Sequence, residues 1–114
     1  MTLSKELVAA STTPLVLSIL TGGECYGYAL IKRVRELSGD RISWSDGMLY
    51  PVLRRLESQG LISSRWQVAE TGRRRRYYRV ETAGSEELAH QREQWNLVAS
   101  VLDRLGKESP QCST

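Results

Sequence analysis

The stretch that decides the fold spans residues 45–80 and reads SDGMLYPVLRRLESQGLISSRWQVAETGRRRRYYRV. Its first part predicts an amphipathic helix that begins after Ser45, a favourable N-cap residue, and ends at Gly60. The apolar positions follow the i, i+3, i+4, i+7 spacing of a single helix face, at Leu49, Val52, Leu53 and Leu56. This face should pack against the core.

The second part of the stretch predicts a β hairpin. Residues 61–68 and 73–80 are rich in apolar, aromatic and β-branched positions, and the loop AETG between them ends in Gly72. Strand alternation places Tyr78 and Val80 on one face and Tyr77 and Arg79 on the other. One tyrosine can therefore pack inward while the other stays outside.

The flanking segments predict three more helices. The first covers residues 3–20, is bent or restarted by Pro14, and stops at Gly22 and Gly23. The second covers residues 26–38, and the last covers about residues 82–106. The fold class is therefore mainly α with a small β hairpin. The order helix, helix, helix, hairpin is that of a winged helix-turn-helix, whose third helix enters the DNA major groove.

The last helix has little of its own chain to pack against. Its apolar residues form a heptad-like seam. We expect a homodimer whose interface contains Leu7 of the first helix together with Leu88, Trp95, Val98, Leu102 and Leu105. The expected organisation is a DNA-binding winged-helix domain with its N-terminal helix at 1–81, a C-terminal dimerisation helix at 82–106 and a disordered polar tail at 107–114.

Positive charge is concentrated in the hairpin. The chain has a net charge of only +3, yet residues 65–79 contain six arginines and one glutamate. Such a patch indicates a polyanionic partner. The predicted DNA-contacting residues are Ser45, Met48, Tyr50, Arg54 and Arg55 on the helix and Arg73, Arg74, Arg75, Arg76 and Tyr77 on the hairpin. The alternatives are a merely solvated arginine run, a core role for Tyr50, and an aliphatic packing role for Arg54 or Arg55.

Several functional classes lack their motifs. A nucleophile elbow and a phosphate-binding glycine loop are absent, so we do not expect an enzyme or a cofactor. His90 is the only histidine and has no convincing metal-ligand partners, and Cys25 and Cys112 are expected to be plain thiols. The sequence has no long apolar run and no signal peptide, so we expect a cytoplasmic protein with no membrane partner.

Three blocks resemble the PadR family of bacterial transcriptional regulators: YGYALIKRVRELSG at 26–39, GMLYPVLRRLESQGLISSRW at 47–66 and GRRRRYYRVETAG at 72–84. The resemblance implies a homodimeric winged-helix repressor that binds a palindromic operator in double-stranded DNA and is often released by a small aromatic or drug-like ligand. Two positions depart from the family pattern. Met48 stands where a small polar residue is usual, and VETAG replaces LTEAG.

The resemblance also suggests an effector site. In drug-responsive members of the small subgroup, a tryptophan on the last helix faces its symmetry mate across a pore. Trp95 is similar in position, so a pocket lined by Leu7, Trp95 and Val98 is one hypothesis. The alternative is that Trp95 is simply an aromatic residue of the dimer seam.

Two other functions remain open from the sequence. The basic hairpin could dock on an acidic protein, or it could bind RNA without sequence preference. The RNA alternative has few stacking residues, essentially Tyr77 and Tyr78. A DNA reader would differ from the protein-interaction module by a steep salt dependence and by placing a dimer on one duplex.

Overall fold

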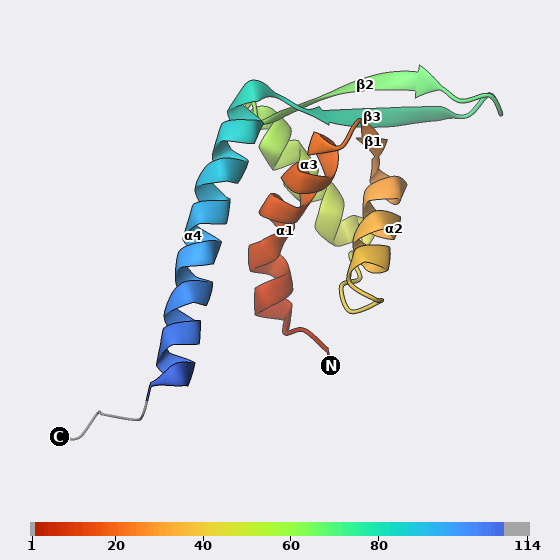
Figure 1. Ribbon diagram of the computed structural model, residues 1–114. Helices are drawn as coiled ribbons and strands as arrows, with labels where there is room; N and C mark the ends of the chain where they lie inside the picture. The colour runs from red at the N-terminus through yellow and green to blue at the C-terminus, as the bar shows by residue number, and fades with distance from the viewer. Residues whose placement is uncertain (1, 109–114) are drawn as a thin grey trace.

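The computed structural model describes residues 2–108 of the chain (Figure 1). It confirms a mainly helical winged-helix fold with a long C-terminal helix. The elements are α1 (Lys5–Thr21), β1 (Cys25–Tyr26), α2 (Gly27–Leu37), α3 (Asp46–Ser58), β2 (Ile62–Val68), β3 (Arg74–Val80) and α4 (Thr82–Lys107). We call β2, β3 and the intervening loop 69–73 the wing.

Helix α1 does not restart at Pro14. It begins after Ser4, whose hydroxyl accepts a hydrogen bond from the Leu7 amide at 3.1 Å, and it runs without a break to Thr21. Proline removes one backbone donor from a helix. The helix nevertheless continues because the turns after Pro14 are fixed in the core, where Val16 and Leu17 are fully buried.

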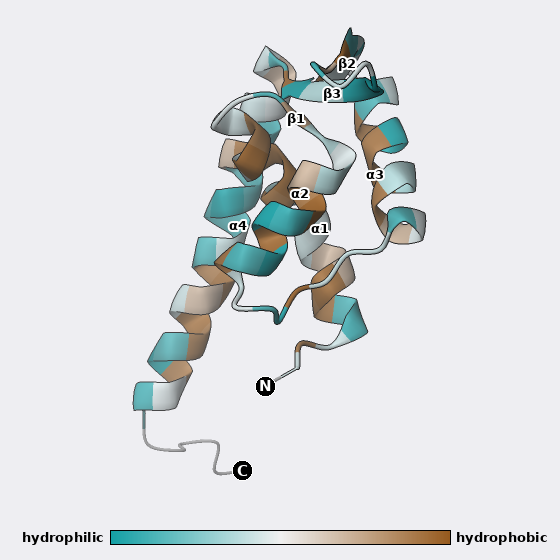
Figure 2. Ribbon diagram, turned by 90° about the vertical axis from the view of Figure 1, so that its right-hand side faces the viewer, coloured by the Kyte–Doolittle hydropathy of each residue, from teal (hydrophilic) through white to brown (hydrophobic). Residues whose placement is uncertain are grey.

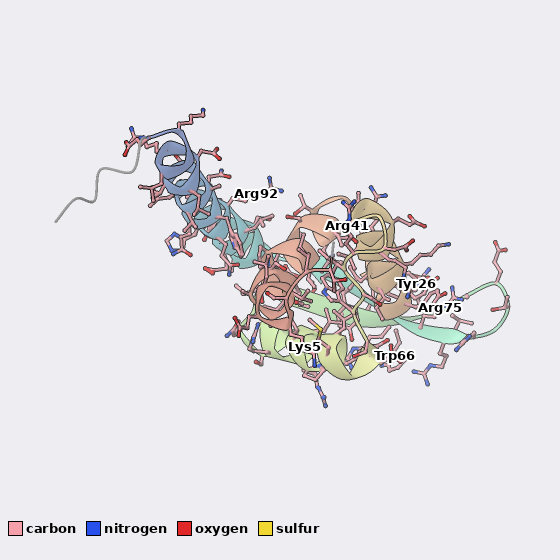
Figure 3. All side chains as sticks on the ribbon, turned by 90° about the horizontal axis from the view of Figure 1, so that it is seen from below. Lys5, Tyr26, Arg41, Trp66, Arg75 and Arg92 are labelled. Atoms are coloured by element: carbon pink, nitrogen blue, oxygen red, sulfur yellow. The ribbon has the colours of Figure 1, made fainter. Side chains whose placement is uncertain are left out.

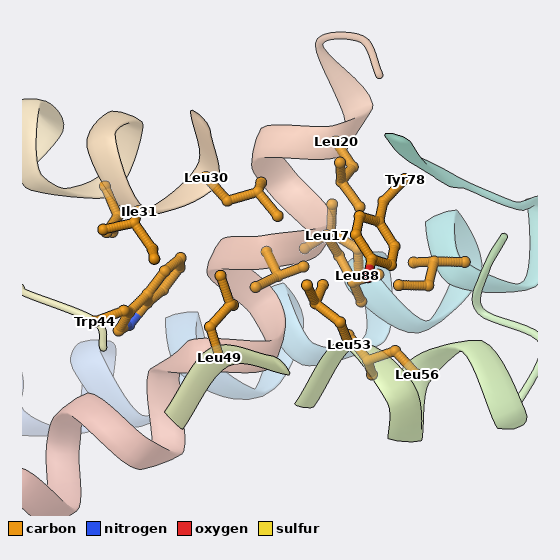
Figure 4. Close-up of a cluster of buried hydrophobic side chains, with 13 residues drawn as sticks. Leu17, Leu20, Leu30, Ile31, Trp44, Leu49, Leu53, Leu56, Tyr78 and Leu88 are labelled. Atoms are coloured by element: carbon orange, nitrogen blue, oxygen red, sulfur yellow. The ribbon is translucent and has the colours of Figure 1, made fainter. Parts of the chain in front are cut away.

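The core lies between the helices and the inner face of the sheet. Leu49, Leu53 and Leu56 of α3 are buried, which confirms the face predicted from their spacing. Figure 4 shows them packed with side chains from the other elements. The remaining buried apolar residues are Val16, Leu17, Leu20, Leu30, Ile31, Val34, Trp44, Ile62, Tyr78 and Leu88.

The sheet contains one strand that the sequence did not predict. Its order is β1-β3-β2, with both pairs antiparallel. Cys25 pairs with Tyr78 and Tyr26 with Tyr77, so Tyr26 lies in a strand and α2 begins one residue later than expected. A two-residue strand is too short to show the alternation by which strands are recognised.

The hairpin itself forms as predicted. Its loop is closed by hydrogen bonds from the Ala69 amide to the Arg73 carbonyl and from the Gly72 amide to the Ala69 carbonyl, both 2.8 Å long. Gly72 has a φ of 83°, a left-handed conformation that suits a residue without a Cβ. Tyr78 is only 5% exposed and Tyr77 is half-buried, which confirms that one tyrosine packs inward.

Helix α4 starts on the body of the protein and then leaves it (Figure 1). Gly84 and Leu88 are its buried residues, so the first turns belong to the core. Gly106 does not end the helix, which includes Lys107 and is followed by Glu108. Residues 109–114 of the tail, which we expect to be disordered, lie outside the described residues.

Candidate nucleic-acid interface

A groove separates the exposed face of α3 from the wing. Asp46, Tyr50 and Arg54 line it on the helix side, and Trp66 and residues 73–76 line it on the wing side. The groove arises because the buried residues of α3 share one face and the wing projects beyond the core from the C-terminal end of the same helix. Its walls therefore combine aromatic surface with positive charge.

The residues predicted at the start of α3 have different environments. The Ser45 hydroxyl caps the helix by accepting a hydrogen bond from the Met48 amide at 3.2 Å. Met48 is half-buried and packs against the core. The Tyr50 hydroxyl lies directly over Gly27, where any Cβ would overlap it, and the Tyr50 side chain remains partly exposed.

The two arginines of α3 point in different directions. Arg54 is exposed and lines the groove. Arg55 instead donates a hydrogen bond from Nη2 to the Thr13 hydroxyl of α1 at 2.8 Å. The structure therefore brings Arg54, but not Arg55, together with the wing arginines.

Aromatic rings support the arginines of the wing. On the inner face of the hairpin, Arg74 Cζ lies 4.9 Å from the centroid of the Trp66 ring, which is 57% exposed. On the outer face, Arg75 Cζ lies 4.4 Å from the Tyr26 ring, which packs edge-on against Tyr77. Figure 3 shows Tyr26, Arg75 and Trp66 partway along the wing, between the helical body and the hairpin loop. Guanidinium groups held over ring faces are attracted by the π system and lose some freedom of movement.

The arginines of this region differ in charge compensation. Within residues 2–108, ion pairs join Arg76 to Glu57 at 3.2 Å and Arg79 to Glu81 at 3.3 Å. Arg65 likewise pairs with Glu24 at 2.8 Å. In the same part of the chain, no ion pair involves Arg54, Arg73, Arg74 or Arg75. Uncompensated positive charge is thus concentrated on both sides of the groove.

Three aromatic residues that line this groove, Tyr26, Tyr28 and Trp66, were missed by sequence reasoning. Trp66 lies on the same sheet face as Ile62 of its own strand and Tyr78 of β3. Strand alternation alone could therefore have placed it on the groove side. Tyr26 could not have been found this way, because its place beneath Arg75 depends on the pairing of β1 with β3.

A second surface lies on α4. Hydrophobic positions recur along the part of the helix that leaves the body, as Figure 2 shows. Leu102 is 65% exposed and Trp95 is 38% exposed, and Leu7 of α1 is also exposed. The other large apolar residues exposed on the helix are Leu97, Val98, Val101 and Leu105. Leu88 is 6% exposed within its own chain, so we exclude it from this surface.

Other candidate sites give little sign of chemistry. Burial raises the pKa of the Cys25 thiol, although Arg33 acts in the opposite direction, and this lowers its reactive thiolate fraction. Within the described residues, no group of three or more His, Cys, Asp or Glu side chains could hold a metal ion. No helix among residues 2–108 is long and apolar enough to cross a membrane.

Comparison with known proteins identifies the family. A stretch of 58 residues is 45% identical to transcriptional regulator Rv3488 of Mycobacterium tuberculosis, covering 51% of this chain and 53% of that protein. The fold is similar to a PadR family transcriptional regulator from Eggerthella lenta (35% identity, TM-score 0.79, covering 91% of this chain and 88% of the other). It is also similar to a transcriptional regulator from Clostridium thermocellum (29% identity, TM-score 0.81, covering 90% and 96%). Residues 16–90 match the model of the transcriptional regulator PadR-like family, and the chain therefore belongs to that family.

Proposed function

We propose that the chain is a homodimeric, sequence-specific DNA-binding repressor that acts on a palindromic operator. The observation that carries this proposal is the uncompensated charge of Arg73, Arg74 and Arg75 across a groove from the exposed face of α3. Other arginines of the same sheet are paired with carboxylates of their own chain. Arginines left unpaired and oriented on aromatic rings fit a phosphate backbone.

The two sides of the groove have separate roles in this proposal. Helix α3 enters the major groove, where Tyr50 and Arg54 face base edges and the adjoining backbone. The wing follows the neighbouring phosphates, and its arginines supply salt-sensitive affinity. Ser45 acts indirectly by capping α3, and Arg55 acts indirectly by holding α3 against α1.

The exposed apolar face of α4 supports a dimer. Trp95, Val98, Leu102 and Leu105 follow one another along the helix at heptad-like spacing, and all four are exposed in the single chain. A second copy of the chain would cover this apolar strip. A twofold axis would present two α3 helices to one DNA face, with half-sites about 34–36 Å apart or a multiple of that distance.

The proposed effector site lies in the same interface. Leu7, Trp95 and Val98 are all exposed in the single chain, so a pocket between them would be completed by the second protomer. A flat aromatic ligand could stack on Trp95 there. With Trp44 and Trp66 replaced, quenching of the remaining tryptophan fluorescence by planar aromatic ligands would test this site.

The experiment that tests DNA recognition is fluorescence anisotropy with two labelled duplexes at two salt concentrations. One duplex comes from the region upstream of the protein's own gene, and the other is a scrambled sequence of equal length. We expect tight, salt-sensitive binding of two chains to the first duplex and much weaker binding to the second. Equal, weak binding to both would contradict sequence-specific recognition at that site and favour docking on an acidic protein.

A further inference from the structure

A single carboxylate connects α3 to both strands of the wing. Glu57 lies in the last turn of α3, and its Oε2 accepts a hydrogen bond from the Ser64 hydroxyl of β2 at 2.6 Å. Its Oε1 accepts a hydrogen bond from Arg76 Nη2 of β3 at 3.2 Å. Arg76 Nε in turn donates to the Ser64 hydroxyl at 2.7 Å, which closes a three-residue network.

This network differs from an ordinary surface ion pair. Solvent-exposed pairs contribute little, because water competes for both charges and the side chains lose entropy. Here Glu57 has 30% and Arg76 has 43% of its side chain exposed, and the Ser64 hydroxyl adds a hydrogen bond to each partner that a simple ion pair lacks. Arg76 is also confined between aromatic neighbours, with Cζ 5.9 Å from the Trp66 centroid and 6.0 Å from that of Tyr78.

The network lies where it can restrict the movement of the wing relative to α3. The hairpin joins the helical body along its base half, where β1 also pairs with β3 at Tyr77 and Tyr78, and its loop projects away from the body (Figure 1). Ser64 and Arg76 lie on the inner face of the hairpin, between the pair at its base, buried Ile62 and half-buried Val80, and the free arginines near the loop. A contact at this level limits how far the wing can swing relative to α3.

We propose that Glu57 is a positioning residue that fixes the wing relative to α3, and thereby makes binding selective for the operator. The proposal rests on the DNA-binding function proposed above. A recognition helix and a wing that are held at one separation fit one path of the DNA backbone and resist others. Glu57 itself touches no base in this account.

The negative charge of Glu57 gives the proposal a second measurable consequence. A carboxylate beside the groove repels phosphate and neutralises Arg76, so it should weaken the sequence-independent part of the affinity. Removing it should therefore strengthen binding to a scrambled duplex while loosening the geometry needed for the operator. Opposite changes on the two duplexes would distinguish positioning from a simple electrostatic effect.

The test compares Glu57→Gln with Glu70→Gln, in the full chain, on operator and scrambled duplexes by anisotropy. Glu70 is exposed in the hairpin loop. Glu70→Gln therefore removes one negative charge, as Glu57→Gln does, but leaves the hydrogen-bond network intact. We expect the ratio of scrambled to operator Kd to fall about tenfold for Glu57→Gln, the loss associated with one hydrogen-bonded charged contact. For Glu70→Gln the ratio should stay within about twofold of the wild-type value, because uniform charge effects cancel in it.

A second variant, Ser64→Ala, keeps the test valid if Glu57→Gln does not fold. Ser64→Ala removes a small half-buried hydroxyl from the network and should lower the same ratio by about threefold. An unchanged ratio in both Glu57→Gln and Ser64→Ala, or equal losses in Glu57→Gln and Glu70→Gln, would overturn the inference alone. Failure of the wild-type protein to distinguish the two duplexes would instead overturn the proposed function.

Discussion

Replacing Gly84 by alanine should show how tightly α4 is seated on the sheet. An alanine Cβ at this buried position would overlap the Leu61 carbonyl oxygen and lie 2.8 Å from Val80 Cγ2. The carbonyl is backbone, and it already accepts a hydrogen bond from the Glu81 amide at 2.9 Å. It cannot rotate aside without losing that bond, so α4 itself has to shift.

The magnitude follows from two opposing effects. Overpacking of this kind costs about 1–3 kcal/mol, and a backbone clash belongs at the upper end of that range. Alanine recovers about 1 kcal/mol because it forms helix more readily than glycine does. The free energy of unfolding of Gly84→Ala should therefore fall by about 2 kcal/mol.

Urea unfolding followed by circular dichroism measures this change. All variants should be compared at one protein concentration, since association of copies would make apparent stability depend on concentration. Gly47→Ala is the matched control: Gly47 is also in a first helical turn, but the nearest atom to its Cβ would be Ser45 Oγ at 4.0 Å. The control should be neutral or slightly stabilised. Equal stability of the two variants would refute this account of how α4 docks.

Three further predictions concern charge, assembly and pH. Arg74→Gln should reduce the slope of log affinity against log salt by about 0.9, as expected when one phosphate contact is lost; titrations at several salt concentrations measure this. Leu102→Glu should shift the proposed dimer towards monomer in sedimentation velocity, because it places charge on the exposed apolar face of α4. Hydrogen bonds from Ser63 and Arg79 hold the pKa of Glu81 below its usual range. The stability this contributes is present above about pH 4.3 and is lost as pH falls through the lower folded pKa, so Glu81→Gln should weaken the acid dependence of urea unfolding.

The fold was largely predictable because its signals are local. The spacing of Leu49, Leu53 and Leu56 defines one helix face, and Gly72 between two strand-like segments defines the hairpin. The heptad-like pattern of α4 was ambiguous in a way that sequence cannot resolve. Leu88 and Leu102 fit the same seam, yet the first is buried in its own chain and the second is exposed. Only the point at which α4 leaves the body separates them.

The candidate site was predictable in composition but not in detail. The arginine run marked the wing, but long-range pairing decides which of its members remain uncompensated. Arg76 is neutralised by Glu57, which precedes it by 19 residues, whereas Arg75 stacks on Tyr26 of a strand that was not predicted. Arg55 similarly contacts Thr13 of α1, 42 residues away. Such partners depend on how the helices and the sheet pack together.

The measurement that tests the central proposal most directly is a hydroxyl-radical footprint of the protein on its upstream DNA. A dimer that inserts two α3 helices and lays two wings along the backbone should protect two symmetric patches, with centres about 10 base pairs or a multiple of that apart. Arg74→Gln should weaken the part of the protection that the wings supply in both patches. A single patch, or even protection along the whole duplex, would contradict the proposed dimeric recognition.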